Sequence, residues 1–367
     1  MASFKLTKSL GIKYPILLSP MAGIATPALS SAITNLGGLG SIPISHIDFT
    51  NLNSVDQLDK LIIRDNSIVN LNFFCHEPVP EPSEASIENW KSLYRKVVNN
   101  EDVVDRVRFT PGKSFKEFET DEDALTRLLG CLEKLRPKVV SFHFGIPSIS
   151  TIGKIHDLGI LVFASATSLD ESVYLHNYDI DGIVLQGFEA GGHRGNFLGD
   201  SDEQLSTQSL FAQVRDYFRE EQDKGTPFLI PAGGINDASI VKYYIENGAA
   251  GVQVGTAFLG VRESLSSPFF TNAVKYERKD TAMVDLVSGK FARTVCTPFI
   301  ESLIKNGKEL QDKELPGYGY RYNAYKELRG LIEGELDVGF YLAGQNYYSI
   351  NPDLPIEEIM KNLTEGI

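Results

Sequence analysis

Residues 227–257 read PFLIPAGGINDASIVKYYIENGAAGVQVGTA, and this stretch decides the fold prediction. The apolar runs Pro227–Pro231 and Gly251–Val254 are short and are followed by glycine, which is typical of buried strands. Between them, the pattern over Asp237–Glu246 predicts a helix that begins at a polar cap and ends before Gly248. The stretch is therefore a strand–helix–strand unit, from which parallel sheets with helices on their faces are built.

The same alternation of short apolar runs and helical patterns covers most of the chain before this unit. Six earlier runs have the composition of buried strands: Ile16–Ser19, Gly40–Ile44, Ile68–Phe74, Lys138–Phe142, Ile160–Ala164 and Gly182–Leu185. Because the crossovers are right-handed and consecutive, eight such units close most simply into a (β/α)8 TIM barrel. The alternative is a doubly wound open sheet, which normally carries a G-x-G-x-x-G turn where this chain has Pro20–Gly23. We therefore predict an α/β barrel.

Two regions interrupt the alternation and indicate the domain organisation. We expect a barrel over residues 1–261 with an insertion at about 76–121, a small helical lobe over 262–345, and a C-terminal segment, 346–367, that packs back on the barrel. Within the lobe, Phe291–Lys308 and Tyr322–Glu333 have helical patterns. The sequence leaves two roles open for the insertion, a gate over a pocket or an interface.

The composition argues against several classes of protein. The chain has 48 acidic and 35 basic side chains and a net charge of −13, which argues against binding to nucleic acid. Its three cysteines, Cys75, Cys131 and Cys296, form no CxxC pair, so we expect neither a disulfide framework nor a structural zinc site. No run approaches the roughly 20 apolar residues of a membrane helix, so we expect no membrane partner. The ordinary apolar fraction of 42% predicts a globular protein. We expect a monomer or a homodimer.

Cysteine usage also favours a reducing compartment, and the cytoplasm is the default prediction. The first acidic residue is Asp48, so the N-terminus is mildly basic and a mitochondrial leader is the alternative. The strand-like run Tyr14–Ser19 begins too early to be removed with such a leader, which favours the cytoplasmic prediction.

The loops that follow the predicted strands are where a barrel of this kind carries its chemistry. Three of them are rich in glycine, namely Gln186–Gly195, Pro231–Asn236 and Gln253–Ala257. Glycine lets backbone N–H groups approach an anion closely, and the loops after strands seven and eight commonly hold phosphate. The phosphate-binding candidates are Gly233, Gly234, Gly255 and Thr256. The alternative is that these glycines only form tight turns.

These loops also carry a resemblance to a known family. Glu189–Gly195, with the sequence EAGGHRG, is the most specific of the shared motifs. The other motifs are Pro15–Gly23, Gly37–Gly40, Asn70–Phe74, Ser141–Gly145, Ala232–Ile235, Gln253–Ala257 and Leu342–Gln345. Over nearly its whole length, the chain resembles the flavin-dependent nitronate monooxygenases, formerly called 2-nitropropane dioxygenases, and within them the class I members of fungi and bacteria.

The resemblance implies a cofactor and a class of substrate. Members of this family are (β/α)8 barrels that bind FMN non-covalently and oxidise alkyl nitronates, such as propionate 3-nitronate, with O2 to a carbonyl compound and nitrite. Carried over by motif, the flavin contacts are Met21, Ala22, Asn72, Gln186, Gly191, Gly234, Gln253, Val254, Gly255 and Thr256. Asn70 competes with Asn72 for one contact, and we favour Asn72 because two phenylalanines follow it directly.

His193 is the strongest of the six histidines as a candidate for catalysis, because it lies in a glycine-rich loop at the predicted mouth of the barrel. A neutral imidazole with a pKa near its usual value of about 6.5 is suited to proton transfer. The resemblance implies that His193 acts as the catalytic base when the substrate is a neutral nitroalkane. His143 ends a predicted strand and is a second candidate for facing the pocket. The chain lacks HExxH or a comparable spacing, so we expect no catalytic metal.

Tyr318, Tyr322 and Lys326 are spaced four residues apart and would share one face of a helix. A cation and two phenols are a suitable lid over an anionic nitronate, and the resembling family has such residues at its substrate pocket. The alternative is a solvated stripe that covers apolar surface. The glycines of Pro316–Tyr320 argue against a regular helix that begins at Tyr318.

Two other functions fit the same predicted scaffold, because one barrel fold hosts many chemistries. The first alternative is an NAD(P)H-dependent flavin reductase that acts on quinones or enoyl thioesters. The second is a flavin-binding protein without catalytic activity. The loop around His193 and the tyrosine–lysine set favour the monooxygenase.

Overall fold

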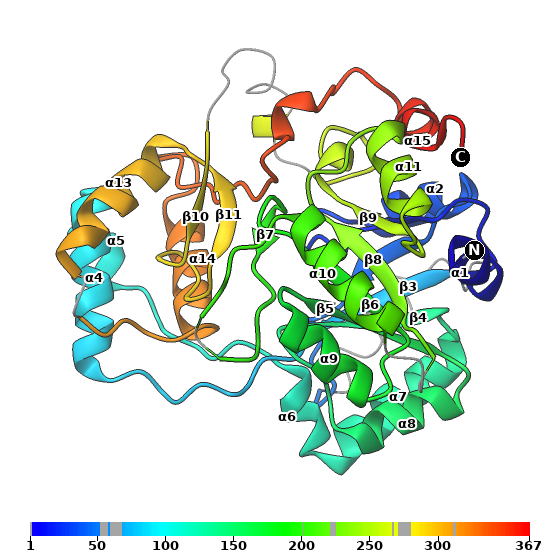
Figure 1. Cartoon of the computed structure of the whole chain (residues 1–367). Helices are drawn as coiled ribbons and strands as arrows, with labels where there is room; N and C mark the ends of the chain where they lie inside the picture. Colours follow the sequence, from blue (N-terminus) through cyan, green and yellow to red (C-terminus); the bar gives the residue numbers. More distant parts are fainter. Residues whose placement is uncertain are drawn as a thin grey trace.

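A computed structural model describes residues 2–51, 58, 68–199, 201–220, 225–265, 268–270, 280–310 and 313–367. Within these residues, one parallel sheet has eight strands: β1 (Ile16–Leu18), β2 (Gly40–Pro43), β3 (Val69–Phe74), β4 (Val139–His143), β5 (Leu161–Ala166), β6 (Gly182–Gln186), β8 (Phe228–Ala232) and β9 (Val252–Val254). The strands pair in the order β1-β9-β8-β6-β5-β4-β3-β2. A further parallel bridge between Leu17 and Leu39 brings the two edges together. The predicted (β/α)8 barrel is confirmed (Figure 1).

The inner face of the barrel changes character along its axis. At the end where the strands begin, it is filled by apolar side chains such as Leu17, Phe163 and Ile230. Helix α1 (Ala2–Leu10) closes this end, because its Leu6 and Leu10 join the same cluster. Towards the other end, polar side chains such as Asn72, Ser141 and Gln186 replace apolar ones on the same face. The barrel therefore has one sealed end and one polar mouth.

Strand register sets the height of the polar side chains at the mouth. Gln186 on β6 pairs with Ala232 on β8, which in turn pairs with Gln253 on β9. On the opposite side, Asn72 on β3 pairs with Ser141 on β4. Because these strands are parallel, their carboxyl ends meet at one mouth, and the loops that follow them surround it.

Helices cover the outside of the barrel, as Figure 1 shows. They are α2 (Pro27–Asn35), α6 (Phe115–Glu119), α7 (Glu122–Leu135), α8 (Ile149–Asp157), α9 (Leu169–Asn177), α10 (Thr207–Glu220), α11 (Ala238–Glu246) and α15 (Ile356–Thr364). Asp237 is the cap of α11, since its side chain accepts hydrogen bonds from the backbone N–H groups of Ser239 and Ile240. Helix α15 packs on α2 and α11 through Ile356, Ile359 and neighbours. Within the described residues, no helix combines the length and apolarity needed to cross a membrane.

A second body lies beside the barrel and combines two distant parts of the chain. Helices α4 (Glu84–Val98) and α5 (Glu101–Asp105) come from the predicted insertion, whereas α13 (Pro298–Gly307) and α14 (Tyr320–Leu331) come from the predicted lobe. They share one apolar core, in which Trp90 and Tyr94 pack with Phe299 and Tyr325. Three short 3-10 helices are also present among the described residues: η1 (Thr256–Phe258) after β9, η2 (Lys308–Leu310) after α13 and η3 (Tyr347–Ser349) before α15. The insertion is thus part of the lobe rather than a separate flap.

The lobe also contains strands, which differs from the all-helical prediction. Strands β10 (Thr281–Val284) and β11 (Ala292–Val295) are antiparallel, and β11 also pairs with β7 (Gly192–His193) of the barrel loop. The helix predicted over Phe291–Lys308 therefore begins only at Pro298. Thr297 caps it, and the proline occupies the first turn, where its missing N–H costs nothing. The prediction missed this boundary because the apolar residues of β11 continue directly into those of α13.

Candidate functional site

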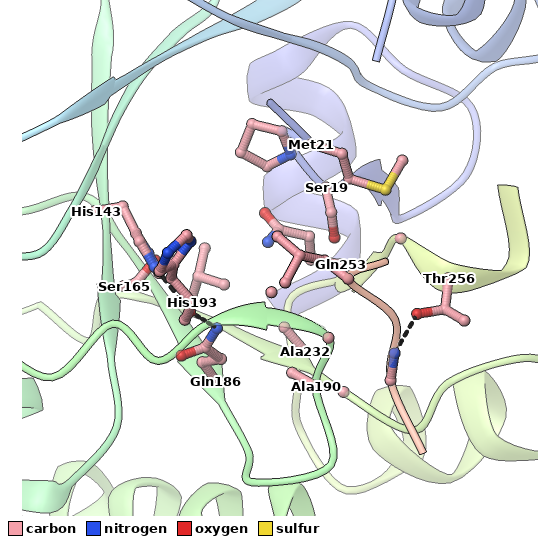
Figure 2. Close-up of a pocket in the computed structure, with 18 of the residues that line it drawn as sticks. Ser19, Met21, His143, Ser165, Gln186, Ala190, His193, Ala232, Gln253 and Thr256 are labelled. Carbon is pink, nitrogen blue, oxygen red and sulfur yellow. Dashed lines mark hydrogen bonds between the residues drawn. The ribbon is translucent and has the colours of Figure 1, made fainter. Parts of the chain in front are cut away.

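The mouth of the barrel contains a pocket whose lining matches the predicted cofactor contacts. Figure 2 shows His143, Ser165, Gln186 and His193 grouped at one side of it and Thr256 at the other. Every residue predicted to contact the cofactor lines this pocket: Met21, Ala22, Asn72, Gln186, Gly191, Gly233, Gly234, Gln253, Val254, Gly255 and Thr256. His143, His193 and Tyr322 line it as well. The structure therefore brings together residues from β1 to β9 and from α14.

Asn72 and Asn70 lie on the same face of β3 but at different depths. Asn70 Nδ2 donates to Ser41 Oγ at 3.1 Å below the pocket. Asn72 lines the pocket, and its Nδ2 donates to Ser141 Oγ at 2.9 Å. Asn72 Oδ1 is buried and has no hydrogen-bond partner among the described residues. Such an atom is costly unless a ligand pairs with it. Asn70 Oδ1 is also buried and unpaired among the described residues, but Asn70 does not line the pocket, so the geometry favours Asn72 over Asn70 as the ligand contact.

The loops after β8 and β9 form a cradle of backbone N–H groups. Gly233 and Gly234 have φ of 123° and 70°, in the region that favours glycine. Among the described residues, the backbone N–H groups of Gly234, Gly255 and Thr256 have no hydrogen-bond acceptor. Unpaired N–H groups at the phosphate-binding loops of a barrel are the chemistry expected of an anion site.

A segment from the C-terminal part of the chain covers this cradle. Thr256 Oγ1 accepts a hydrogen bond from the backbone N–H of Gly344 at 3.0 Å. At Gly191, a Cβ atom would lie 2.5 Å from the carbonyl carbon of Ala343, so only glycine fits there. Leu342, Gly344 and Asn346 line the pocket, although none was predicted as a site residue. The signal that pointed to this segment was the motif Leu342–Gln345, to which the prediction gave no role.

His193 stands on β7, where strand pairing with β11 fixes its backbone. Its carbonyl oxygen accepts hydrogen bonds from Gln186 Nε2 at 2.9 Å and from His143 Nε2 at 3.1 Å. Its own Nε2 lies 2.9 Å from Ser288 Oγ in the lobe. The backbone and one ring nitrogen are therefore held, and the imidazole has little freedom to reorient.

His143 lines the pocket, but its two nitrogens bond within the protein. Nε2 meets the His193 carbonyl, and Nδ1 lies 2.9 Å from Ser165 Oγ. Since a carbonyl only accepts, Nε2 is the protonated nitrogen and Nδ1 accepts the Ser165 hydroxyl. This arrangement assigns His143 to holding the His193 loop, and its predicted contact with substrate stays a prediction.

The lobe surrounds the His193 ring with aromatic side chains. The rings of Tyr318 and Tyr322 meet it edge to face, with centroids at 5.7 Å and 5.4 Å, and Phe144 does so at 5.9 Å. Burial, followed by the nearby His143, Lys326 and Lys290, lowers the pKa of His193 from its usual value of about 6.5 to about 3. Burial likewise lowers the pKa of His143 to about 4. The expectation of a His193 pKa near 6.5 is therefore wrong, because the sequence did not show how completely the lobe covers the ring.

Tyr318, Tyr322 and Lys326 lie together, as their spacing predicted. Helix α14 begins at Tyr320, so Tyr318 precedes it, yet the rings of Tyr318 and Tyr322 still lie nearly parallel with centroids 6.4 Å apart. The ammonium of Lys326 lies 4.1 Å from the centroid of the Tyr322 ring. Burial lowers the pKa of Lys326. Tyr322 lines the pocket. Tyr318 does not line it, but its ring contacts the ring of His193, which does.

Two residues near His193 were not predicted. Ser288 and Lys290 belong to the turn between β10 and β11, and the Lys290 ammonium lies 4.8 Å from the centroid of the Phe144 ring. Burial lowers the pKa of Lys290 as well. No local sequence signal marks this turn, because only the packing of the lobe on the barrel brings it to the site.

Two residues next to the site have structural roles. Arg194 is buried, and its guanidinium pairs with Asp202 at 2.8 Å and donates to the Gln186 carbonyl. Glu189 accepts hydrogen bonds from the Thr207 N–H and hydroxyl at the start of α10, at 2.9 Å and 3.0 Å. Both side chains therefore hold the scaffold around the site together.

Comparison with known proteins places the chain among relatives of known name. The chain matches a family model described as nitronate monooxygenase over residues 3–366. A protein of Saccharomyces cerevisiae is 41% identical over 374 residues, covering 97% of this chain and 91% of that protein. Nitronate monooxygenases of Paraburkholderia phytofirmans and Pseudomonas aeruginosa are 32% and 31% identical, over 96% and 99% of this chain and 92% and 99% of their own lengths.

Solved structures show the same fold at lower identity. A nitroalkane oxidase from Streptomyces ansochromogenes has a TM-score of 0.76 and 24% identity, over 98% of this chain and 96% of that one. FabK from Thermotoga maritima has a TM-score of 0.65 and 22% identity, over 98% and 94% of the two chains. At these identities the likeness concerns the fold alone.

Proposed function

Because this chain belongs to the nitronate monooxygenase family, we propose that it is an FMN-dependent oxidoreductase that converts alkyl nitronates and O2 to a carbonyl compound and nitrite. The observation that carries this proposal is the composition of one pocket. An unpaired backbone cradle stands at one side, and a buried histidine with tyrosine and lysine neighbours stands at the other. The first suits a phosphate and the second suits an anionic substrate.

The residues present fit FMN. The backbone N–H groups of Gly234, Gly255 and Thr256 would hold its phosphate, and Met21 from the first loop would contact its ring system. Asn72 Oδ1, buried and without a partner, would accept a hydrogen bond from the flavin. When bound, the flavin supplies the electron-accepting chemistry that amino-acid side chains lack.

The other side of the pocket would bind and orient the nitronate. Lys290 is partly buried and Lys326 is exposed, and neither has an ion-pair partner among the described residues. Neither lysine lines the pocket, but both lie close enough to His193 to lower its pKa. Their positive charge would stabilise a nitronate anion bound beside His193. Burial, and after it the nearby His143, Lys326 and Lys290, lowers the pKa of His193, so at pH 7 its imidazole is neutral.

With a neutral nitroalkane, His193 would have a second task. Its neutral imidazole would accept the proton from the carbon next to the nitro group, and the nearby cations would stabilise the nitronate that forms. A preformed nitronate needs no base. We therefore propose that His193 is catalytic for nitroalkanes and orienting for nitronates, and that nitronates such as propionate 3-nitronate are the natural substrates.

The function is tested by measuring nitrite, carbonyl product and O2 consumption with propionate 3-nitronate and with ethylnitronate, without any nicotinamide. We expect nitrite from both substrates. In the His193→Asn variant, nitroethane turnover should fall by about 100-fold or more, whereas nitronate turnover and flavin content should change little. Equal loss with both substrates would refute the role of base. NADH-dependent quinone or enoyl reduction without nitrite release would replace the monooxygenase by a reductase.

A further inference from the structure

The turn between β10 and β11 contacts the ring of His193 through Ser288. Ser288 is fully buried, and its Oγ lies 2.9 Å from His193 Nε2. The two residues are 95 positions apart in the chain, so this contact is a product of the lobe docking on the barrel. The protons in this contact decide which nitrogen of His193 is basic.

Counting donors around Ser288 assigns the protons. Ser288 Oγ lies 2.9 Å from the carbonyl oxygen of Lys290, and a carbonyl can only accept. The single hydroxyl proton of Ser288 is therefore used in that bond. The hydrogen bond between Ser288 and His193 then needs its proton from the histidine, so Nε2 is protonated and Nδ1 carries the lone pair. In the opposite tautomer, the contact between Ser288 Oγ and the Lys290 carbonyl would have no proton.

The turn itself is held rigidly, so Ser288 presents its hydroxyl in one position. The N–H of Gly289 donates to the Asp285 carbonyl at 2.7 Å, and Arg321 of α14 donates to the same carbonyl at 3.2 Å. Gly289 has φ of 90°, and a Cβ there would lie 2.8 Å from the backbone nitrogen of Tyr318. The turn is thus held by contacts with Tyr318 and α14 on one side and with the His193 loop on the other.

Other groups face His193, but none takes over this function. Its Nδ1 has no hydrogen-bond partner among the described residues, and the ring otherwise meets aromatic faces and edges. The charged neighbours Lys290 and Lys326 carry donors and would repel a protonated imidazole. Ser288 is therefore the group that selects between the two neutral tautomers.

We propose that Ser288 is a positioning residue that holds His193 as the Nε2–H tautomer and so makes Nδ1 the atom that accepts the substrate proton. The proposal rests on the proposed role of His193 as base, and it adds the atom and the residue that selects it. When a nitroalkane reacts, its C–H bond breaks, the proton moves to Nδ1, and the electron pair stays on the substrate as the nitronate. The imidazolium that forms then carries protons on both nitrogens.

The direct test is nitrogen-15 NMR of the flavin-bound protein labelled at histidine, with the His193 signals assigned by their loss in His193→Asn. We expect a protonated Nε2 and an unprotonated Nδ1 at pH 7. In Ser288→Ala, both tautomers should be populated. A wild-type spectrum with a protonated Nδ1 would overturn the proposal, whatever the enzyme's activity.

Kinetics provide a second test with matched variants. Ser288→Ala should lower kcat/KM for nitroethane by about tenfold or more and change it for ethylnitronate by less than about twofold, while Ser288→Thr, which keeps the hydroxyl, restores part of the loss. Ser114→Ala is the control, because Ser114 is also buried and donates to a carbonyl, that of His76, away from His193. Equal losses with both substrates in Ser288→Ala would overturn the proposal. If wild-type protein releases no nitrite from either substrate, the proposed function fails, and the NMR result still decides the tautomer.

Discussion

Acidification from pH 7 to pH 5 should destabilise the fold through two histidines of the pocket, the buried His193 and the partly buried His143. In the folded protein, burial lowers the pKa of His193 to about 3 and that of His143 to about 4, whereas both titrate at about 6.5 when unfolded. Below pH 6.5 the unfolded chain therefore binds protons that the folded chain does not. Stability is fully present above pH 6.5 and is lost as the pH falls towards the folded values.

The size of this loss follows from the same pKa values. Each pH unit between the unfolded and folded pKa costs about 1.4 kcal/mol per histidine. The span from pH 6.5 to pH 5 is about 1.5 units, so each histidine contributes about 2 kcal/mol and the two together about 4 kcal/mol. That is a large share of the roughly 5–15 kcal/mol that stabilises a typical domain.

Urea unfolding of flavin-free protein at pH 7 and pH 5 measures this loss, followed by circular dichroism. The comparison is a double variant, His143→Gln with His193→Gln, which is less stable at pH 7 but lacks the titrating groups. We expect the wild-type free energy of unfolding to fall by about 4 kcal/mol more than that of the variant. If both proteins lose the same free energy over this range, the two imidazoles are not buried as described.

Three further predictions concern the pocket. Gly234→Val should lower FMN affinity at least about tenfold because it fills the backbone cradle. Gly248→Val, which is also strained because Gly248 has a positive φ of 103° but lies outside the pocket lining, should leave affinity unchanged; equal affinities by fluorescence titration would contradict the cradle. Lys326→Met should raise KM for ethylnitronate about tenfold with a smaller change in kcat, and an unchanged KM would remove the lysine from the substrate site. The pH profile of kcat/KM for nitroethane should show no enzyme inflection between pH 5 and pH 8, since His193 is already neutral there; an inflection near 6.5 lost in His193→Asn would show a solvated imidazole.

The barrel was predictable because its information is local. Strands buried on both faces form continuous apolar runs, and glycine follows several of them at the mouth, as in residues 227–257. The eight predicted strands agree with the observed ones to within one or two residues. Because parallel strands end together, the loop residues Gln186, Gly234 and Gln253 also converged as predicted.

What the sequence did not show depends on contacts between distant segments. The insertion joins the lobe because Trp90 packs in one core with Phe299, and neither residue's neighbours indicate the other. Ser288 reaches His193 only after the lobe docks, and the same docking buries the imidazole and lowers its pKa. Local patterns record which residues are apolar or flexible, but they do not record which surfaces meet.

The proposed function requires that a nitronate be oxidised in the flavin-loaded protein without a nicotinamide. The most direct measurement is the absorbance spectrum of the purified protein mixed anaerobically with propionate 3-nitronate, and separately with NADH. We expect an oxidised flavin spectrum that changes on mixing with nitronate alone and returns when O2 is admitted. A flavin spectrum that changes only with NADH, or a protein that takes up no FMN, would contradict the proposed function.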